Sequence, residues 1–222
     1  MSAGKGVAGS GRLITGVAWA VLLLGLWLWG RGVADGSGFG SSAPTTGDVA
    51  AVGRPLGVPM PPARAPLDPA KPERVDVPSI GITAPVVSRG LDAAGAVDPP
   101  PFSAPGTVGW YGRGVQPGAK GAALFVGHVD TETRPAVFYG LSAAKAGEKV
   151  RVTRTDGSVA EFTIDDVKVF SRKHFDAKKV YGSHDKSRAE LRLITCGGTF
   201  DRKTNEYTAN VVVSAYLTAA KT

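Results

Sequence analysis

Residues 149–170 read KVRVTRTDGSVAEFTIDDVKVF, and this stretch decides the class of fold. Apolar and polar side chains alternate over 149–154 and again over 159–170, which is the period-two pattern of a strand with one buried face. The dipeptide Asp156-Gly157 between the two runs is typical of a tight β-turn, because both residues tolerate the backbone angles that such a turn needs. The sequence therefore predicts a β-hairpin here.

Short apolar runs of the same kind occur on both sides of this hairpin, separated by Gly- and Pro-rich turns. They lie at 75–77, 80–82, 85–87, 107–111, 122–126, 191–195 and 211–216. No long stretch has the 3.6-residue period of an amphipathic helix, and only 138–146 and 174–181 are expected to hold a short turn or helix. Seven or eight strands over about 150 residues predict an all-β barrel or sandwich.

Length and charge narrow the class of protein. The chain has 222 residues, enough for one domain and a tail, and its hydrophobic fraction of 43% excludes a wholly disordered chain. The formal net charge of +7 favours anionic partners such as anionic lipid or cell-wall polymers. Because no block of Lys and Arg is interleaved with aromatic residues, we expect no nucleic-acid partner.

A long apolar run near the N-terminus predicts a membrane anchor. The sequence LITGVAWAVLLLGLWLW at 13–29 has no charged side chain, and a helix of that length spans about 25 Å of a bilayer. Lys5 and Arg12 precede it, so the segment 1–12 is expected in the cytoplasm. We predict a single-pass signal anchor at 13–30 in the cell membrane, with the rest of the chain outside. A cleaved signal peptide is the competing interpretation.

The composition changes again after the anchor. Residues 31–72 are dominated by Gly, Ser, Ala and Pro, and such a segment buries too little apolar surface to offset the entropy of ordering it. We therefore predict a disordered linker over 31–72, extended in its Pro-rich second half, followed by a folded domain over 73–222.

The chain contains one cysteine, Cys196, so the folded domain has no internal disulfide. An unpaired thiol outside the cell is open to oxidation. Either the side chain is buried and inert, or its reactivity is its purpose. Cys196 directly follows the apolar run 191–195 and precedes Gly197-Gly198, two residues that leave room for a substrate backbone and expose N–H donors.

Of the three histidines, His128 is placed best to pair with Cys196. It follows the apolar run 122–126, within the sequence GHVD, and two strand ends are able to lie side by side whatever their separation in sequence. His174 and His184 lie in a Lys-rich polar stretch and are expected to be exposed. A nucleophilic cysteine needs a base of this kind. A buried structural cysteine near a histidine fits the same spacing.

Several motifs, in order along the chain, resemble the class F sortases of actinobacteria. They are LFVGHVD at 124–130, RPAVFYGL at 134–141, LRLITCGGTFD at 191–201 with its L-x-T-C element at 193–196, Tyr207, and NVVV at 210–213. The resemblance extends over roughly residues 73–218. It implies an eight-stranded sortase-type β-barrel with short helices, outside the membrane.

The resemblance also implies a reaction. The Cys196 thiolate attacks the Thr–Gly bond of an LPxTG-like C-terminal sorting signal and forms a thioester, while His128 protonates the departing amine. An amine of peptidoglycan or its precursor then accepts the acyl group. The thiolate and the imidazolium are expected to stabilise one another, which lowers the pKa of the thiol.

The sequence departs from the family pattern at one position. Sortases are expected to hold the substrate and its oxyanion with an Arg on the last strand. Here the head of that strand carries Asn210, whose amide donates a hydrogen bond without a charge. Arg202, in the segment after Cys196, is either a second candidate or a solvated charge. Asp130 either orients the imidazole of His128 or caps a turn.

Other classes of protein remain as alternatives. An L,D-transpeptidase is disfavoured because Gly-Gly follows Cys196, and a papain-like peptidase because His128 precedes Cys196. A membrane-tethered wall-binding module with a degenerate site is the alternative that is not an enzyme. We expect a monomer, and no metal or other cofactor, because the acidic residues are scattered without the spacing of a calcium loop.

Overall fold

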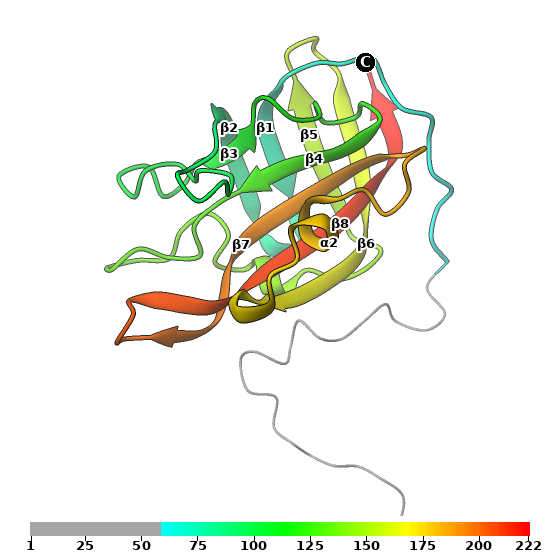
Figure 1. The fold of residues 1–222 in the computed structure, drawn as a ribbon. Helices are drawn as coiled ribbons and strands as arrows, with labels where there is room; N and C mark the ends of the chain where they lie inside the picture. The colour runs from blue at the N-terminus through cyan, green and yellow to red at the C-terminus, as the bar shows by residue number, and fades with distance from the viewer. Residues whose placement is uncertain (1–58) are drawn as a thin grey trace, which may run out of the picture. The chain divides into compact units, whose positions relative to one another are not determined.

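The computed structural model describes residues 59–222, and eight β-strands form its framework (Figure 1). In chain order they are β1 (Pro72–Val77), β2 (Ile82–Arg89), β3 (Val108–Tyr111), β4 (Gly121–Val126), β5 (Lys149–Arg154), β6 (Val159–Ser171), β7 (Ala189–Asp201) and β8 (Glu206–Lys221). The described helical turns are short: η2 (Pro78–Ile80), η3 (Leu141–Ala143), η4 (Arg172–His174) and α2 (Ala177–Tyr181).

The strands close into a barrel in the order β1-β2-β3-β4-β7-β8-β6-β5. Two neighbouring pairs, β2 with β3 and β4 with β7, are parallel, and the other pairs are antiparallel. The prediction of an eight-stranded β-barrel with short helices is confirmed. The hairpin predicted around Asp156-Gly157 is β5–β6, and Gly157 has φ 79°, a left-handed value that a residue with a side chain rarely adopts.

Strand residues alternate between two apolar clusters, one on each side of the barrel wall. The inner cluster fills the barrel and includes Phe125, Leu193 and Val213. The outer cluster lies against β4, β7 and β8 and consists of Val97, Leu124, Val126, Val180, Ile194 and Val212. Val180 belongs to α2, which lies over β7 and β8 in Figure 1. The outer face of these strands is therefore covered near its middle by α2 and the segment between β2 and β3.

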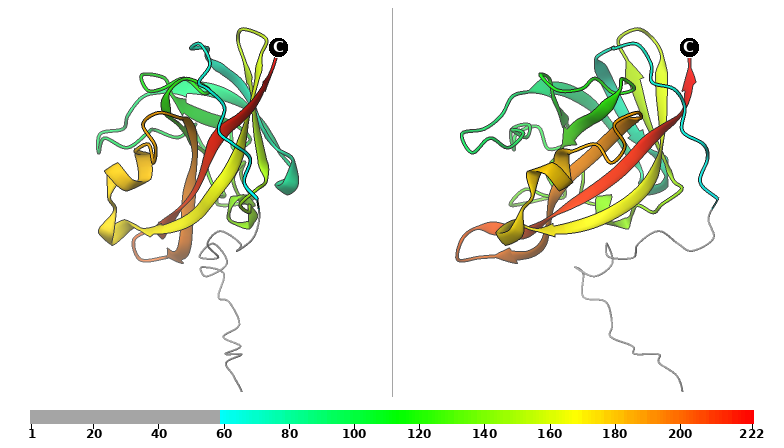
Figure 2. Two further views of the ribbon diagram at one scale, coloured as in Figure 1. Left: turned by 90° about the vertical axis from the view of Figure 1, so that its right-hand side faces the viewer. Right: turned by 45° about the vertical axis from the view of Figure 1, so that its right-hand side comes forward.

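The last two strands are longer than the sequence predicts. Beyond the expected runs, β7 and β8 continue as a hairpin that projects from the barrel (Figures 1 and 2), with Phe200 opposite Tyr207. The Phe200 and Tyr207 rings meet edge to face, with centroids 5.1 Å apart, and the N–H of Thr199 donates to Thr208 Oγ1 at 3.0 Å. These contacts hold a hairpin whose polar, Gly-containing sequence does not read as a strand.

Residues 59–71, called the N-terminal arm below, have no helix or strand and lie along the barrel. The N–H of Arg64 donates to the Leu217 carbonyl at 2.9 Å, and the N–H of Leu67 donates to the Gly118 carbonyl at 2.8 Å. The arm is the last part of the predicted linker. The predicted cytoplasmic segment, signal anchor and remaining linker lie outside the described residues. Within the described part of the chain, no helix has the length and hydrophobicity that a membrane crossing requires.

Candidate active site

Cys196 lies on β7 at the point where the β7–β8 hairpin leaves the barrel. It is half-buried, and its neighbour across β8 is Asn210. Because side chains alternate along a strand, Cys196 shares a face with Ile194, two residues earlier, and Ile194 belongs to the outer apolar cluster. The thiol therefore lies on the outer face of the barrel wall, just beyond the part that the outer cluster covers.

His128 lies beside Cys196 because β4 and β7 are adjacent parallel strands. Val126 pairs with Ile194, and the N–H of Gly127 donates to the Ile194 carbonyl at 3.1 Å. Two residues beyond that pair come His128 and Cys196, and neighbouring strands lie about 4.8 Å apart. A Cβ on Gly127 would lie 2.7 Å from the Phe138 ring, so a side chain at this position would clash with Phe138. The register thus brings together the two residues predicted from the sequence.

The segment between β2 and β3 holds the imidazole of His128. Nε2 lies 2.7 Å from the carbonyl oxygen of Pro100, and since a carbonyl only accepts, Nε2 carries a proton and donates it. The Phe102 ring stacks on the imidazole with centroids 4.2 Å apart and an interplanar angle of 21°. Among the hydrogen bonds within residues 59–222, none joins His128 to the Cys196 sulfur. Nδ1 is the ring nitrogen that remains for proton transfer.

Burial raises the pKa of the Cys196 thiol above its ordinary value. The guanidinium of Arg172 opposes that effect, while the carboxylates of Asp130 and Glu206 add to it. The direction is opposite to the lowered thiol pKa that the sequence led us to expect. The physical reason is that loss of hydration, reinforced by two carboxylates, outweighs the one cation. The free thiol is therefore mostly protonated at neutral pH.

Asp130 contacts the β7–β8 hairpin. Its Oδ2 accepts a hydrogen bond from the Tyr207 hydroxyl, and burial together with this bond raises the pKa of Tyr207 to about 12. The sequence left two roles open for Asp130, orienting His128 or capping a turn. The structure adds a third role, because the carboxylate joins the loop after β4 to the hairpin after Cys196.

The two candidates for a third catalytic residue lie in different places. Asn210 is directly opposite Cys196 on β8 and half-buried, so its amide is on the side of the thiol. Arg202 is exposed in the turn between Asp201 and Glu206, at the tip of the hairpin. Because a strand rises about 3.3 Å per residue, the tip is roughly 15 Å from Cys196. The structure brings Asn210 to the predicted pair and does not bring Arg202 there.

Comparison with known families gives the chain a classification. A model of the Sortase domain matches residues 75–218, which is more than half of the chain. The chain belongs to the sortase family. No curated protein matches it.

Solved structures of sortases resemble this sortase in fold. Sortase C1 of Streptococcus agalactiae has a TM-score of 0.50 and 15% identity, covering 66% of this chain and 67% of that chain. Sortase A of Listeria monocytogenes has a TM-score of 0.48 and 21% identity, covering 68% and 90%. The Sortase D5 transpeptidase of Clostridium perfringens has a TM-score of 0.48 and 18% identity, covering 66% and 78%. At such identities the likeness concerns the fold alone.

One charged pair near the thiol of this sortase has no signal in the local sequence. Arg172, the first residue of η4, lies 3.3 Å through Nη2 from Glu206 Oε1 on β8. Arg172 belongs to the stretch SRKHFDAKKVYGSHDKS, whose many charges read as a solvated surface. His174 and His184 in that stretch are exposed, as predicted. Only the pairing of β6 with β8 reveals that Arg172 differs from its neighbours.

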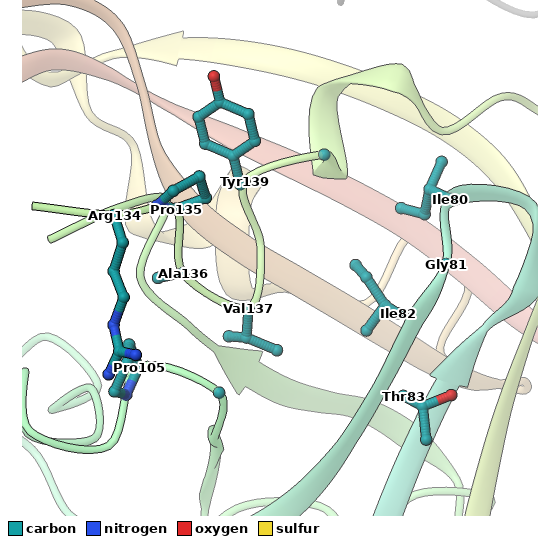
Figure 3. A pocket seen from close by; sticks show the side chains of 12 residues that line it. Ile80, Gly81, Ile82, Thr83, Pro105, Arg134, Pro135, Ala136, Val137 and Tyr139 are labelled. Atoms are coloured by element: carbon teal, nitrogen blue, oxygen red, sulfur yellow. The ribbon is translucent and has the colours of Figure 1, made fainter.

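A pocket of about 460 Å³ opens beside η2 and the start of β2, and Cys196 and His128 do not line it. Its walls include Ile80, Ile82 and Val137, with the Arg134 side chain at one side (Figure 3). Within residues 59–222, no three His, Cys, Asp or Glu side chains are grouped to hold a metal ion.

Proposed function

We propose that this sortase is a class F transpeptidase of actinobacterial type that attaches secreted proteins to the cell wall. The observation that carries the proposal is the placing of Cys196 and His128 at the ends of adjacent parallel strands in a chain of the sortase family. The substrate is the LPxTG-like sorting signal at the C-terminus of a secreted protein. The acceptor is an amine of peptidoglycan or its precursor.

The reaction has two acyl transfers through one thioester. The Cys196 thiol gives its proton to Nδ1 of neutral His128, and the resulting thiolate attacks the Thr carbonyl of the Thr–Gly bond. An S–C bond forms, and the carbonyl π electrons move to oxygen. When the oxyanion collapses, the C–N bond breaks and protonated His128 gives its proton to the departing glycine amine. The acceptor amine then loses a proton to neutral His128, attacks the thioester and releases the thiolate. No other reactant is needed.

We also propose that the enzyme is anchored in the cell membrane and acts as a monomer. The sequence before residue 31 is proposed to be a cytoplasmic segment and a single membrane anchor, with the catalytic domain in the extracytoplasmic wall layer. Asn210, opposite Cys196, is proposed to donate a hydrogen bond to the oxyanion, in preference to Arg202 at the hairpin tip. The enzyme is proposed to work as a monomer without a cofactor.

The test is a transfer assay with an LPxTG peptide and triglycine as acceptor. The expected product joins the peptide through its Thr to triglycine, and both Cys196→Ala and His128→Ala abolish it. Peptidoglycan sedimentation tests the alternative in parallel, with the same proteins. Transfer that survives in Cys196→Ala contradicts the mechanism. If the protein binds peptidoglycan but gives no transfer product with any of several sorting-signal variants, it is a wall-binding module and not a transpeptidase.

A further inference from the structure

The proposed reaction passes through two anions at one place. The Cys196 thiolate is the first, and the oxyanion on the substrate carbonyl is the second. A preorganised positive charge or hydrogen-bond donor lowers the energy of both. β8 offers no Arg, since its residues from Glu206 to Ala220 contain no cation and Lys221 ends it far from the thiol. The positive charge of this site must come from another element.

The end of β6 lies two strands from Cys196. Phe170 of β6 pairs with Asn210 of β8, and Asn210 pairs with Cys196 of β7, so the three residues form one row across the sheet. Two strand spacings correspond to about 10 Å between the backbones of Phe170 and Cys196. Arg172 follows Phe170 by two residues, at the edge of that row. Figures 1 and 2 show the turn after β6 lying against β7 and β8 where the hairpin leaves the barrel.

Strand pairing brings the start of η4 next to the row that carries the thiol. Ser171 of β6 pairs with Ala209 of β8, and Ala209 pairs with Gly197 of β7, the residue after Cys196. Arg172 directly follows Ser171, so it lies where β6 stops pairing at the base of the hairpin. From there Arg172 Nη2 lies 3.3 Å from Glu206 Oε1 on β8.

Charged and titratable groups surround Cys196 from three elements. They are His128 and Asp130 after β4, Arg172 in η4, and Glu206 and Tyr207 on β8. Of these, the guanidinium of Arg172 is the one that lowers the pKa of the thiol, while Asp130 and Glu206 raise it. Arg202, at the hairpin tip, is not among the groups that shift it.

We propose that Arg172 is the catalytic cation of this site: it pairs with Glu206 in the free enzyme and turns to the Cys196 sulfur and the substrate oxyanion during acylation. The inference rests on the proposed transpeptidase reaction. Arg172 has 44% of its side chain exposed, so its guanidinium is free to move without disturbing the core. Glu206, with 54% exposed, holds the guanidinium near the thiol until the substrate arrives.

The test compares Arg172→Ala, Arg172→Lys and Glu206→Gln with Lys173→Ala, which removes one positive charge from the next residue. The first readout is the rate of Cys196 alkylation by iodoacetamide from pH 6 to pH 10, which needs no substrate. Arg172→Ala is expected to slow alkylation at pH 7.5 by about 3- to 10-fold, and Glu206→Gln to speed it. Arg172→Lys is expected to keep the wild-type pH profile, because it keeps the charge.

The second readout is the rate of acylation by an LPxTG peptide. Arg172→Ala is expected to lower it by about 100-fold, and Arg172→Lys by less, because an ammonium replaces the charge but not the forked donor. Equal profiles for Arg172→Ala and Lys173→Ala would overturn the inference, as would a 100-fold loss in Arg202→Ala with none in Arg172→Ala. A wild-type enzyme that is never acylated, with the alkylation differences intact, would reject the proposed function and leave the electrostatic role of Arg172.

Discussion

At the residue scale, the thiol of Cys196 has to be reactive in a place that disfavours its charge. Burial raises its pKa, two carboxylates raise it further, and Arg172 works against them. The imidazole of His128 lies on the neighbouring strand end, yet its Nε2 donates to the Pro100 carbonyl. In the free enzyme the thiol is therefore protonated, and Nε2 of the neighbouring His128 is engaged by the Pro100 carbonyl. We expect the thiol and the imidazole to reach their reactive positions only when substrate binds.

The raised pKa of Cys196 predicts the pH profile of its alkylation. Since the thiolate is the reactive form and the thiol pKa lies above its ordinary value, the rate should rise about tenfold per pH unit from pH 6 to pH 8 and go on rising above pH 8. Iodoacetamide labelling followed by mass spectrometry measures it. A rate that levels off below pH 8 would show a thiol that ionises readily, as the sequence alone led us to expect.

Phe102 is predicted to act on catalysis through His128. Its ring stacks on the imidazole, and the residue is 66% exposed, so Phe102→Ala should leave the Tm of the barrel unchanged. An aromatic stack contributes about 0.5–1.5 kcal/mol, which corresponds to a fall in kcat/KM of roughly 2- to 12-fold. Phe102→Tyr should keep the activity. An unchanged kcat/KM in Phe102→Ala would show that the ring stack does not contribute to catalysis.

At the element scale, the β7–β8 hairpin and the loop after β4 form the two sides of the site. One hydrogen bond between side chains joins them, from the Tyr207 hydroxyl to Asp130. The hairpin is also supported by the Phe200–Tyr207 ring contact, which lies further from the thiol. We therefore expect the hairpin to open by local separation from the loop, with Tyr207 as the residue that limits it.

Tyr207→Phe is predicted to loosen the hairpin. The change keeps the ring contact and removes a hydrogen bond to a carboxylate, which contributes about 1.5–3 kcal/mol. Amide hydrogen exchange should quicken over 197–210 and stay unchanged in the barrel strands. Tyr139→Phe is the matched control, since the Tyr139 hydroxyl has no hydrogen bond in the described part of the chain. Equal exchange in both variants would mean that the Asp130 bond does not hold the hairpin.

Individual elements differ in how far the sequence predicts them. The β5–β6 hairpin is predictable because Asp156-Gly157 and the alternation beside it are local features. The outer half of the β7–β8 hairpin is not, because Gly197 and Gly198 interrupt the pattern and a tertiary ring contact supports the strands. Arg172 is hidden for a related reason: its place near Cys196 depends on strand pairing across β8, and nothing in its own neighbourhood marks it.

The pair of Cys196 and His128 is predictable from the sequence only in part. The sequence shows that each follows an apolar run, and the resemblance to sortases names the pair, but their proximity depends on the register of β4 against β7. The bond from His128 to Pro100 and the stack of Phe102 come from a segment without a strand or helix. Such contacts are set by tertiary packing and have no signal in local sequence patterns.

At the scale of the whole molecule, the N-terminal arm adds contacts to a barrel that is otherwise closed by strand pairing. The Tyr216 hydroxyl donates to the Pro61 carbonyl at 2.7 Å, and Arg154, which is buried, donates to the Asp68 carbonyl. With the backbone bonds of Arg64 and Leu67, these contacts run along much of the arm. The arm is thus part of the folded unit in the described residues.

Removal of the arm is predicted to destabilise the barrel. A chain of residues 72–222 loses five hydrogen bonds that 59–222 keeps: the four above and one from the Thr155 N–H to the Lys71 carbonyl. One of the five comes from the buried Arg154 guanidinium. At about 0.5–1.5 kcal/mol for each bond, the free energy of unfolding should fall by about 2.5–7.5 kcal/mol. Urea denaturation of the two chains measures it. Equal midpoints and slopes would show that the arm only lies on the surface.

The most direct test of the account is the intact mass of residues 59–222 after incubation with an LPxTG peptide and no acceptor amine. We expect an added mass equal to the peptide acyl group up to its Thr. It should be located on Cys196, sensitive to hydroxylamine and absent in Cys196→Ala. Addition of triglycine should discharge the adduct into a transfer product. An enzyme whose mass stays unchanged with every sorting-signal variant, or an adduct that persists in Cys196→Ala, would contradict the central claim that Cys196 is the nucleophile of a sortase.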